Sequence, residues 1–231
     1  MSIAENTALV RENMRAAALR AGRDPAEILL VAATKMNDAD RVRQAVAAGV
    51  DICGENRVQE MLEKNAQGAY LGAPLHFIGH LQKNKVRQVV GVAELIHGAD
   101  SLELLSAIDR AALARGLRQD VLLEINIGAE SSKSGFAPED VPHILEKAAE
   151  FGSVRVRGLM AIPPICASED EIRPYFSRMQ QLFVDNGGKK YDNVHMDFLS
   201  MGMSADYSAA IECGANMVRV GAAIFGARIY R

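Results

Sequence analysis

Lys35 is the first residue whose type and position could do chemistry. It closes the apolar run Leu29–Lys35 (LLVAATK), where a charged side chain is costly unless it reaches solvent or has a chemical task. A lysine in such a place can lose its proton, and its neutral amine can then attack an aldehyde to form a Schiff base. A lysine that simply emerges into solvent at the end of a strand would leave the same pattern. The residue therefore indicates carbonyl chemistry without establishing it.

Two turns near the end of the chain combine glycine with small residues. Gly202 and Ser204 follow one apolar run, and Gly221 and Ala222 follow the next. Backbone N–H groups in glycine-containing turns and at helix N-termini can bind phosphate oxygens. One such turn would be ordinary turn chemistry, but two behind neighbouring strands predict a phosphate cradle. Helices are expected to begin beside these turns, over Ala205–Glu212 and Ala222–Ala227.

Other polar residues carry a weaker signal. Arg219 lies within the run Met217–Val220, where a buried guanidinium needs a carboxylate, a carbonyl or a ligand atom as acceptor. From the residues alone we expect a structural ion pair there. His76 and His80 lie on one face of a strand without a carboxylate partner, so we expect no metal site. No GxGxxG motif follows the first strand, which leaves a dinucleotide site unsupported.

These candidates lie at the ends of eight short apolar runs that alternate with helical patterns. The runs are mostly continuous, as in strands whose two faces are both covered. Alternation of strand and helix is typical of parallel βαβ units. The predicted strands are Leu29–Lys35, Val50–Asn56, Leu75–His80, Glu94–His97, Val121–Ile127, Val154–Met160, Met196–Met201 and Met217–Val220.

Eight parallel strands close most simply into an α/β (β/α)8 TIM barrel, with an open doubly wound sheet as the alternative. We predict a single domain over residues 1–231, with helices over Asp38–Ala48 and Ser101–Ala114 that begin at N-caps Asp38 and Ser101. An extra N-terminal helix over Glu5–Ala21 should pack outside the barrel and fill the gap left by the short chain after strand eight. Because barrels carry function at the C-terminal ends of their strands, Lys35 and the two turns should share one mouth.

Composition and charge narrow the class of protein. The 231 residues are 49% hydrophobic and 24% charged, with a net charge of -3 and no basic stripe that would favour nucleic acid or an anionic membrane. Three scattered cysteines indicate neither disulfides nor zinc. No signal peptide is recognisable, and no apolar run approaches the ~20 residues of a membrane helix. We expect a cytoplasmic protein that binds neither nucleic acid nor membranes.

Seven motifs follow one another along almost the whole chain. They are VAATK (31–35), GENRVQE (54–60), HFIGHLQKNK (76–85), ESSKSGF (130–136), GLMAIP (158–163), LSMGMSADYSAAI (199–211) and VRVGAAIFGAR (218–228). No single motif is decisive, but their order and spacing together are highly specific. In this combination the chain resembles the pyridoxal phosphate homeostasis proteins, which are relatives of the N-terminal barrel of bacterial alanine racemase.

The resemblance implies a barrel that carries pyridoxal 5'-phosphate (PLP) as a Schiff base on Lys35. Asn56 would lie beside the cofactor ring. Arg219 would face the pyridine nitrogen instead of forming an ion pair, and an arginine there weakens the cofactor as an electron sink. The phosphate would be held by Ser204, Gly221 and the backbone at Ala222, with Ser200 nearby.

The chain departs from the family pattern at two places. Family members commonly carry threonine after the glycine of the last motif, where this chain has Ala222. A hydroxyl to the phosphate would then be missing, so we expect weaker phosphate binding. Met36 and Asn37 follow Lys35, where family members frequently have threonine and a proline-containing segment. The conformation of the loop after Lys35 therefore cannot be carried over from the family, whereas the Schiff base on Lys35 can.

Two functions are compatible with the resemblance, a PLP carrier or buffer and a PLP-dependent amino-acid racemase. A racemase needs an acid/base group on each face of its substrate, and Lys35 supplies one. In alanine racemase the other is a tyrosine from a further domain of the partner subunit, and this chain ends soon after strand eight. None of its five tyrosines sits where it clearly replaces that base.

We therefore expect a monomeric, non-enzymatic protein of PLP homeostasis, with PLP-dependent apoenzymes as candidate partners. A third reading is a PLP-free barrel isomerase that binds a sugar phosphate. It explains the phosphate cradle but makes Lys35 incidental.

Overall fold

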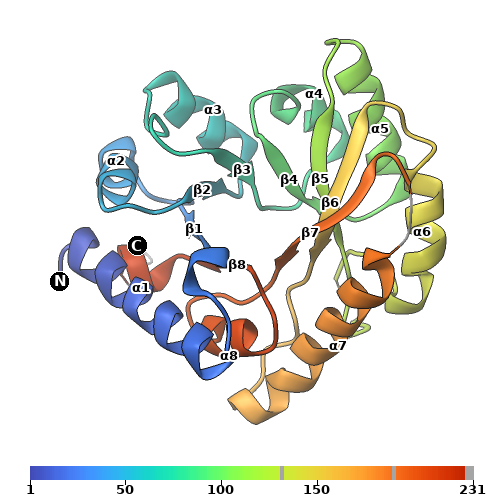
Figure 1. Cartoon of the computed structure of the whole chain (residues 1–231). Helices are drawn as coiled ribbons and strands as arrows, with labels where there is room; N and C mark the ends of the chain where they lie inside the picture. Colours follow the sequence, from blue (N-terminus) through green and yellow to red (C-terminus); the bar gives the residue numbers. More distant parts are fainter. Residues whose placement is uncertain (131–132, 189–190, 227–231) are drawn as a thin grey trace.

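The computed structural model describes residues 1–130, 133–188 and 191–226. Eight parallel strands pair in chain order, and the eighth also pairs with the first, so the sheet closes into a barrel (Figure 1). The strands are β1 (Leu29–Ala33), β2 (Ile52–Glu55), β3 (Leu75–Phe77), β4 (Leu95–Ala99), β5 (Gln119–Glu124), β6 (Val154–Met160), β7 (Val194–Ser200) and β8 (Met217–Val220). Closure confirms the predicted TIM barrel and excludes the open sheet.

All eight predicted strands are present, and β6 and β8 have the predicted bounds. The first strand ends two residues before Lys35, because the chain turns at Met36, whose φ is 61°. The fifth strand ends three residues earlier than predicted. There the end of β5 pairs with the loop that follows it, and the Phe136 N–H donates to the Glu124 carbonyl over 2.8 Å.

Helices between the strands form the outer layer of the barrel (Figure 1). Both predicted N-caps are confirmed: the Asp38 carboxylate accepts the Arg41 N–H over 2.8 Å, and Ser101 Oγ accepts the Leu104 N–H over 3.3 Å. The helices are α1 (Ile3–Arg20), α2 (Ala39–Ala47), α3 (Val58–Ala66), α4 (Val86–Val89), α5 (Leu102–Leu113), α6 (Val141–Ala148), α7 (Glu169–Gly187), α8 (Tyr207–Glu212) and α9 (Ala222–Phe225).

The last two helices are shorter than predicted. Helix α8 begins at Tyr207, two residues late, because Asp206 in the preceding turn accepts the Met203 N–H over 2.5 Å. Helix α9 ends at Phe225, since Gly226 adopts a φ of 90° that leaves the helical region. Ala227, the predicted end of that helix, lies outside the described residues.

The N-terminal helix α1 lies outside the barrel against α8 and α9, as predicted (Figure 1). Asn6 donates to the Ile224 carbonyl over 2.9 Å, and Arg20 pairs with Glu212 at 2.6 Å. Helix α1 therefore covers the side of the barrel where little chain follows β8. Over the described ranges, every helix falls short of the length or the apolar character needed to cross a membrane.

The barrel interior holds an apolar cluster and a set of buried polar side chains. Side chains alternate between the two faces of a strand, so residues two positions apart share a face. Each of the polar residues named below lies two positions from an apolar residue of the interior cluster or from one packed against it, and therefore faces the interior as well. The apolar cluster is Val31, Ile52, Ile78, Leu95, Leu122, Met160 and Met217. The polar residues are His76, His97, Ser200 and Arg219.

The two interior histidines predict how stability depends on pH. Burial lowers the pKa of His76 from 6.5 to about 4 and that of His97 well below 6.5, so both rings are neutral in the folded protein. Between pH 6.5 and about 4 the unfolded chain binds more protons than the folded one. The free energy of unfolding should therefore fall as the pH falls, by about 1.4 kcal/mol per pH unit for each histidine.

Urea unfolding between pH 7 and pH 5 measures this slope. The variant His76→Gln should show a shallower slope than the wild type, and exposed His195→Gln serves as the matched control. Equal slopes in all three proteins would contradict the linkage.

Candidate functional site at the mouth of the barrel

The predicted site residues come from four consecutive strands around the barrel, β7, β8, β1 and β2. This order brings the two ends of the chain together, because β8 pairs with β1. The seven residues are Lys35 after β1, Asn56 after β2, Ser200 at the end of β7, Ser204 in the following turn, Arg219 within β8, and Gly221 and Ala222 directly after it. Their placement on one sector of the mouth agrees with the prediction, while their contacts with a cofactor stay predictions.

Lys35 is half-buried and lies directly beside a strained turn. It continues the alternation of Val31 and Ala33, which face the barrel interior. Met36 adopts a φ of 61°, which is uncommon for a residue other than glycine, and its N–H donates to the Glu60 carboxylate over 2.7 Å. The turn therefore fixes the backbone at the residue next to the candidate nucleophile.

A buried ion pair supports this turn from behind. Lys64 Nζ lies 2.7 Å from Glu55 Oε2 and 3.0 Å from Glu60 Oε2, and it donates to the Thr34 carbonyl over 2.9 Å. Thr34 Oγ1 also donates to Glu55, over 3.0 Å. Several hydrogen bonds compensate the buried charges, as such a pair requires. We did not predict this cluster, and its one sequence signal is the i,i+4 spacing of Glu60 and Lys64.

The two C-terminal turns are joined by one hydroxyl. Ser204 Oγ accepts the N–H groups of Gly221 and Ala223 over 3.1 and 3.3 Å. Gly202 must be glycine, because its φ is 90° and a Cβ would lie 2.5 Å from the Cβ of Ala210. Among the described residues, neither the Ser204 hydroxyl proton nor the Ala222 N–H has an acceptor. These two groups are therefore available to an anion.

Asn56 carries an acceptor with nothing to accept from. Its Oδ1 atom is buried and has no hydrogen-bond partner in the described part of the chain, while its N–H donates to Glu55 Oε1 over 2.8 Å. Buried polar atoms in native proteins are nearly always paired, so an orphaned oxygen at the mouth indicates a place for a polar ligand.

Arg219 is 4% exposed and is held by two neutral acceptors. Its Nη1 donates to Ser200 Oγ over 2.6 Å and its Nη2 to the Ala161 carbonyl over 3.0 Å. Burial lowers its pKa to about 10, which leaves it cationic at neutral pH. The prediction of an ion pair, made from the residues alone, is wrong: no carboxylate of the described residues lies within 4.0 Å of the Arg219 guanidinium. The remaining guanidinium N–H groups find no acceptor there either.

Ser200 is held by two neighbouring side chains inside the barrel. Its side chain is fully buried, and Oγ lies 3.1 Å from His97 Nδ1 as well as 2.6 Å from Arg219. The Ser200 hydroxyl therefore accepts a hydrogen bond that helps to hold Arg219 in place. A direct contact between Ser200 and a cofactor stays a prediction.

The opposite side of the mouth is acidic. His80 Nδ1 lies 3.1 Å from Asp100 Oδ2, so the expectation that His80 lacks a carboxylate partner is wrong. Burial and then the charge of Asp100 raise the pKa of Glu124. Within the described ranges, no group of three or more His, Cys, Asp or Glu side chains is placed to hold a metal ion.

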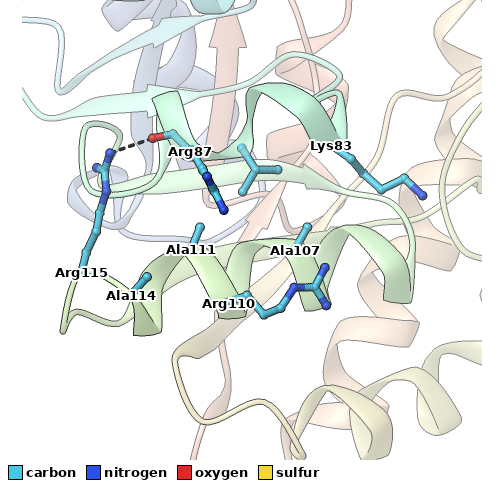
Figure 2. Close-up of a pocket in the computed structure, with 8 residues that line it drawn as sticks. Lys83, Arg87, Ala107, Arg110, Ala111, Ala114 and Arg115 are labelled. Atoms are coloured by element: carbon cyan, nitrogen blue, oxygen red, sulfur yellow. Dashed lines mark hydrogen bonds between the residues drawn. The ribbon is translucent and has the colours of Figure 1, made fainter.

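A cavity of about 550 Å³ lies between α4 and α5 on the outside of the barrel (Figure 2). Its charged lining is Lys83, Arg87, Arg110 and Arg115, and the Arg115 guanidinium donates to the Arg87 carbonyl over 2.7 Å. None of the seven predicted site residues lines it, so this basic groove is separate from the mouth.

Known proteins match this sequence along almost the whole chain. The family model for the N-terminal domain of alanine racemase matches residues 6–229. A pyridoxal phosphate homeostasis protein from Aquifex aeolicus is 40% identical over 230 residues, which cover 100% of both chains. The protein of that name from Escherichia coli K12 is 42% identical over 231 residues, covering 99% of this chain and 97% of its own.

A solved structure adds the fold of a relative. PipY from Synechococcus elongatus, solved with PLP bound, superposes with a TM-score of 0.83 at 31% identity, covering 97% of this chain and 100% of PipY. The resemblance seen in the motifs is thus confirmed. The chain belongs to the pyridoxal phosphate homeostasis protein family, within the wider family of the alanine racemase N-terminal domain.

Proposed function

We propose that this protein binds PLP at the mouth of its barrel, anchored on Lys35, and serves the homeostasis of PLP without a committed reaction of its own. The observation that carries the proposal is the convergence, on four adjacent strands, of a half-buried lysine with hydrogen-bonding groups that have no partner in the described part of the chain. The family membership and the PLP-bound relative support the same assignment.

The groups present fit the parts of this cofactor. An amine on Lys35 matches an aldehyde, and the uncommitted donors of Ser204 and Ala222 match phosphate oxygens. The Arg219 guanidinium can donate only, which matches a pyridine nitrogen that accepts. The Asn56 amide, with its orphaned Oδ1, supplies a further polar contact beside the ring.

The residues also support a carrier over a catalyst. When bound, PLP supplies a reactive aldehyde and an electron sink, and the strength of the sink depends on a proton at the ring nitrogen. Arg219 keeps its own proton at neutral pH, because its pKa is about 10 even when buried. It therefore donates a hydrogen bond without protonating the ring, which weakens the sink.

Lys35 and the turn behind it do the binding. The buried contacts of Lys64 and Glu60 hold the backbone on both sides of Lys35 in place, so the point from which its side chain extends is fixed. The proposal includes a monomeric protein in the cytoplasm that exchanges PLP with PLP-dependent apoenzymes, as expected from the sequence.

Reduction with borohydride tests the anchor. After incubation with PLP, the peptide that contains Lys35 should gain the mass of one phosphopyridoxyl group, and Lys35→Ala should lose this adduct. Lys83→Arg, which changes an exposed lysine of the basic groove, is the control and should keep it. A folded wild-type protein without an adduct at Lys35 would overturn the PLP proposal and favour a phosphate-binding barrel of another kind.

The absence of a committed reaction is tested with an L-amino acid. The PLP-loaded protein should leave the optical rotation of the amino acid unchanged over hours, because none of the tyrosines is expected to supply the second acid/base group that a racemase needs. A time-dependent loss of rotation that disappears in Lys35→Ala would replace the carrier by a racemase.

Substitutions of Ala222, the residue after Gly221, test the phosphate site. Ala222 is exposed beside Ser204 and Gly221, so Ala222→Thr adds a hydroxyl without burying a new group. A new hydrogen bond to the phosphate should lower the Kd for PLP by about 2- to 10-fold. Ala222→Val has nearly the shape of threonine without the hydroxyl and should leave the Kd unchanged. Equal affinities of the two variants would contradict the phosphate assignment.

A further inference from the structure

Four buried side chains form one hydrogen-bonded chain across the barrel interior. Arg219 on β8 donates to Ser200 on β7 over 2.6 Å, Ser200 Oγ lies 3.1 Å from His97 Nδ1 on β4, and His97 Nε2 lies 3.0 Å from His76 Nδ1 on β3. None of the four is more than 6% exposed. The chain thus links the proposed cofactor site to the opposite wall of the barrel.

The chemistry of the four groups gives this chain one direction. A guanidinium only donates, so Ser200 Oγ accepts from Arg219 and its own proton must go elsewhere. Its other neighbour within hydrogen-bond distance in the described structure is His97 Nδ1, which must then accept. A neutral His97 whose Nδ1 accepts carries its proton on Nε2 and donates to His76 Nδ1.

The reverse direction leaves a buried proton unpaired. If His97 Nδ1 donated to Ser200, the hydroxyl would accept twice and its own proton would have no acceptor among the described residues. An unsatisfied buried donor costs about 1–3 kcal/mol. A doubly protonated His97 would create the same conflict, and its burial and the nearby Arg219 charge oppose that form by lowering its pKa.

We propose that His97, with His76 behind it, is a positioning residue that acts through Ser200 to hold the Arg219 guanidinium toward the ring nitrogen of PLP. This inference rests on the proposed function. With the Ser200 proton committed to His97, the lone pairs of Oγ remain turned toward Arg219. Without His97, the hydroxyl is free to rotate, and Arg219 keeps only the Ala161 carbonyl as a fixed acceptor.

The first arm of the test uses the protein before any cofactor is added. Nitrogen-15 NMR of the histidine rings should show His97 and His76 as neutral rings protonated at Nε2. A ring protonated at Nδ1, or an imidazolium at neutral pH, would contradict the donor and acceptor roles assigned to these hydrogen bonds and would overturn the inference.

The second arm measures the visible absorption of the protein loaded with PLP. His97→Leu and Ser200→Ala should move the absorption maximum in the same direction as Arg219→Lys, because each loosens the group at the ring nitrogen. His97→Asn restores an acceptor near the position of Nδ1 and should recover at least half of the shift. Circular dichroism and thermal unfolding establish which variants are folded, and Ser200→Ala removes only one oxygen.

The outcomes separate the two claims. An adduct on Lys35 in the wild type together with an unmoved absorption maximum in a folded His97→Leu or Ser200→Ala overturns the positioning role alone. No adduct in the wild type overturns the proposed function and the ring-nitrogen role with it. A shift in both variants that His97→Asn reverses supports the inference.

Discussion

The buried guanidinium of Arg219 is the constraint on which the site depends. A charge inside a barrel is tolerated only where acceptors surround it, and a carboxylate partner would be the simplest solution. The structure instead uses one hydroxyl and one carbonyl, which satisfy part of the guanidinium, while the carboxylates of Glu124 and Asp206 act on its charge from beyond ion-pair distance. Donors without an acceptor among the described residues remain available to a ligand. A structural ion pair would have satisfied them internally and closed the site.

Barrel closure determines which groups can meet that ligand. Because β8 pairs with β1, the phosphate turns near the end of the chain lie beside Lys35 near its beginning. The backbone around Lys35 is held by the buried Lys64 and Glu55 pair on one side and by the strained Met36 on the other. The anchor and the cradle are thus positioned by elements far apart in sequence.

Much of this could be predicted from the sequence, and the failures have physical reasons. The hydrophobic residues of β6 and β8 predicted the bounds of both strands, although arginines interrupt both runs. The end of β1 depends on the backbone conformation of Met36, and the hydrophobic pattern of the sequence carries no information about that conformation. The hydrogen bond between Ser200 and His97 was not predicted, because His97 comes from a distant strand. Hydrogen bonds across a barrel depend on register, and no pattern within one strand encodes that.

A crystal structure of the protein grown with PLP tests the central claim most directly. We predict continuous density from Lys35 Nζ to the cofactor, with the phosphate at Ser204 and Ala222 and the ring nitrogen at Arg219. PLP bound elsewhere, such as in the basic groove between α4 and α5, with the mouth holding only water, would contradict this account.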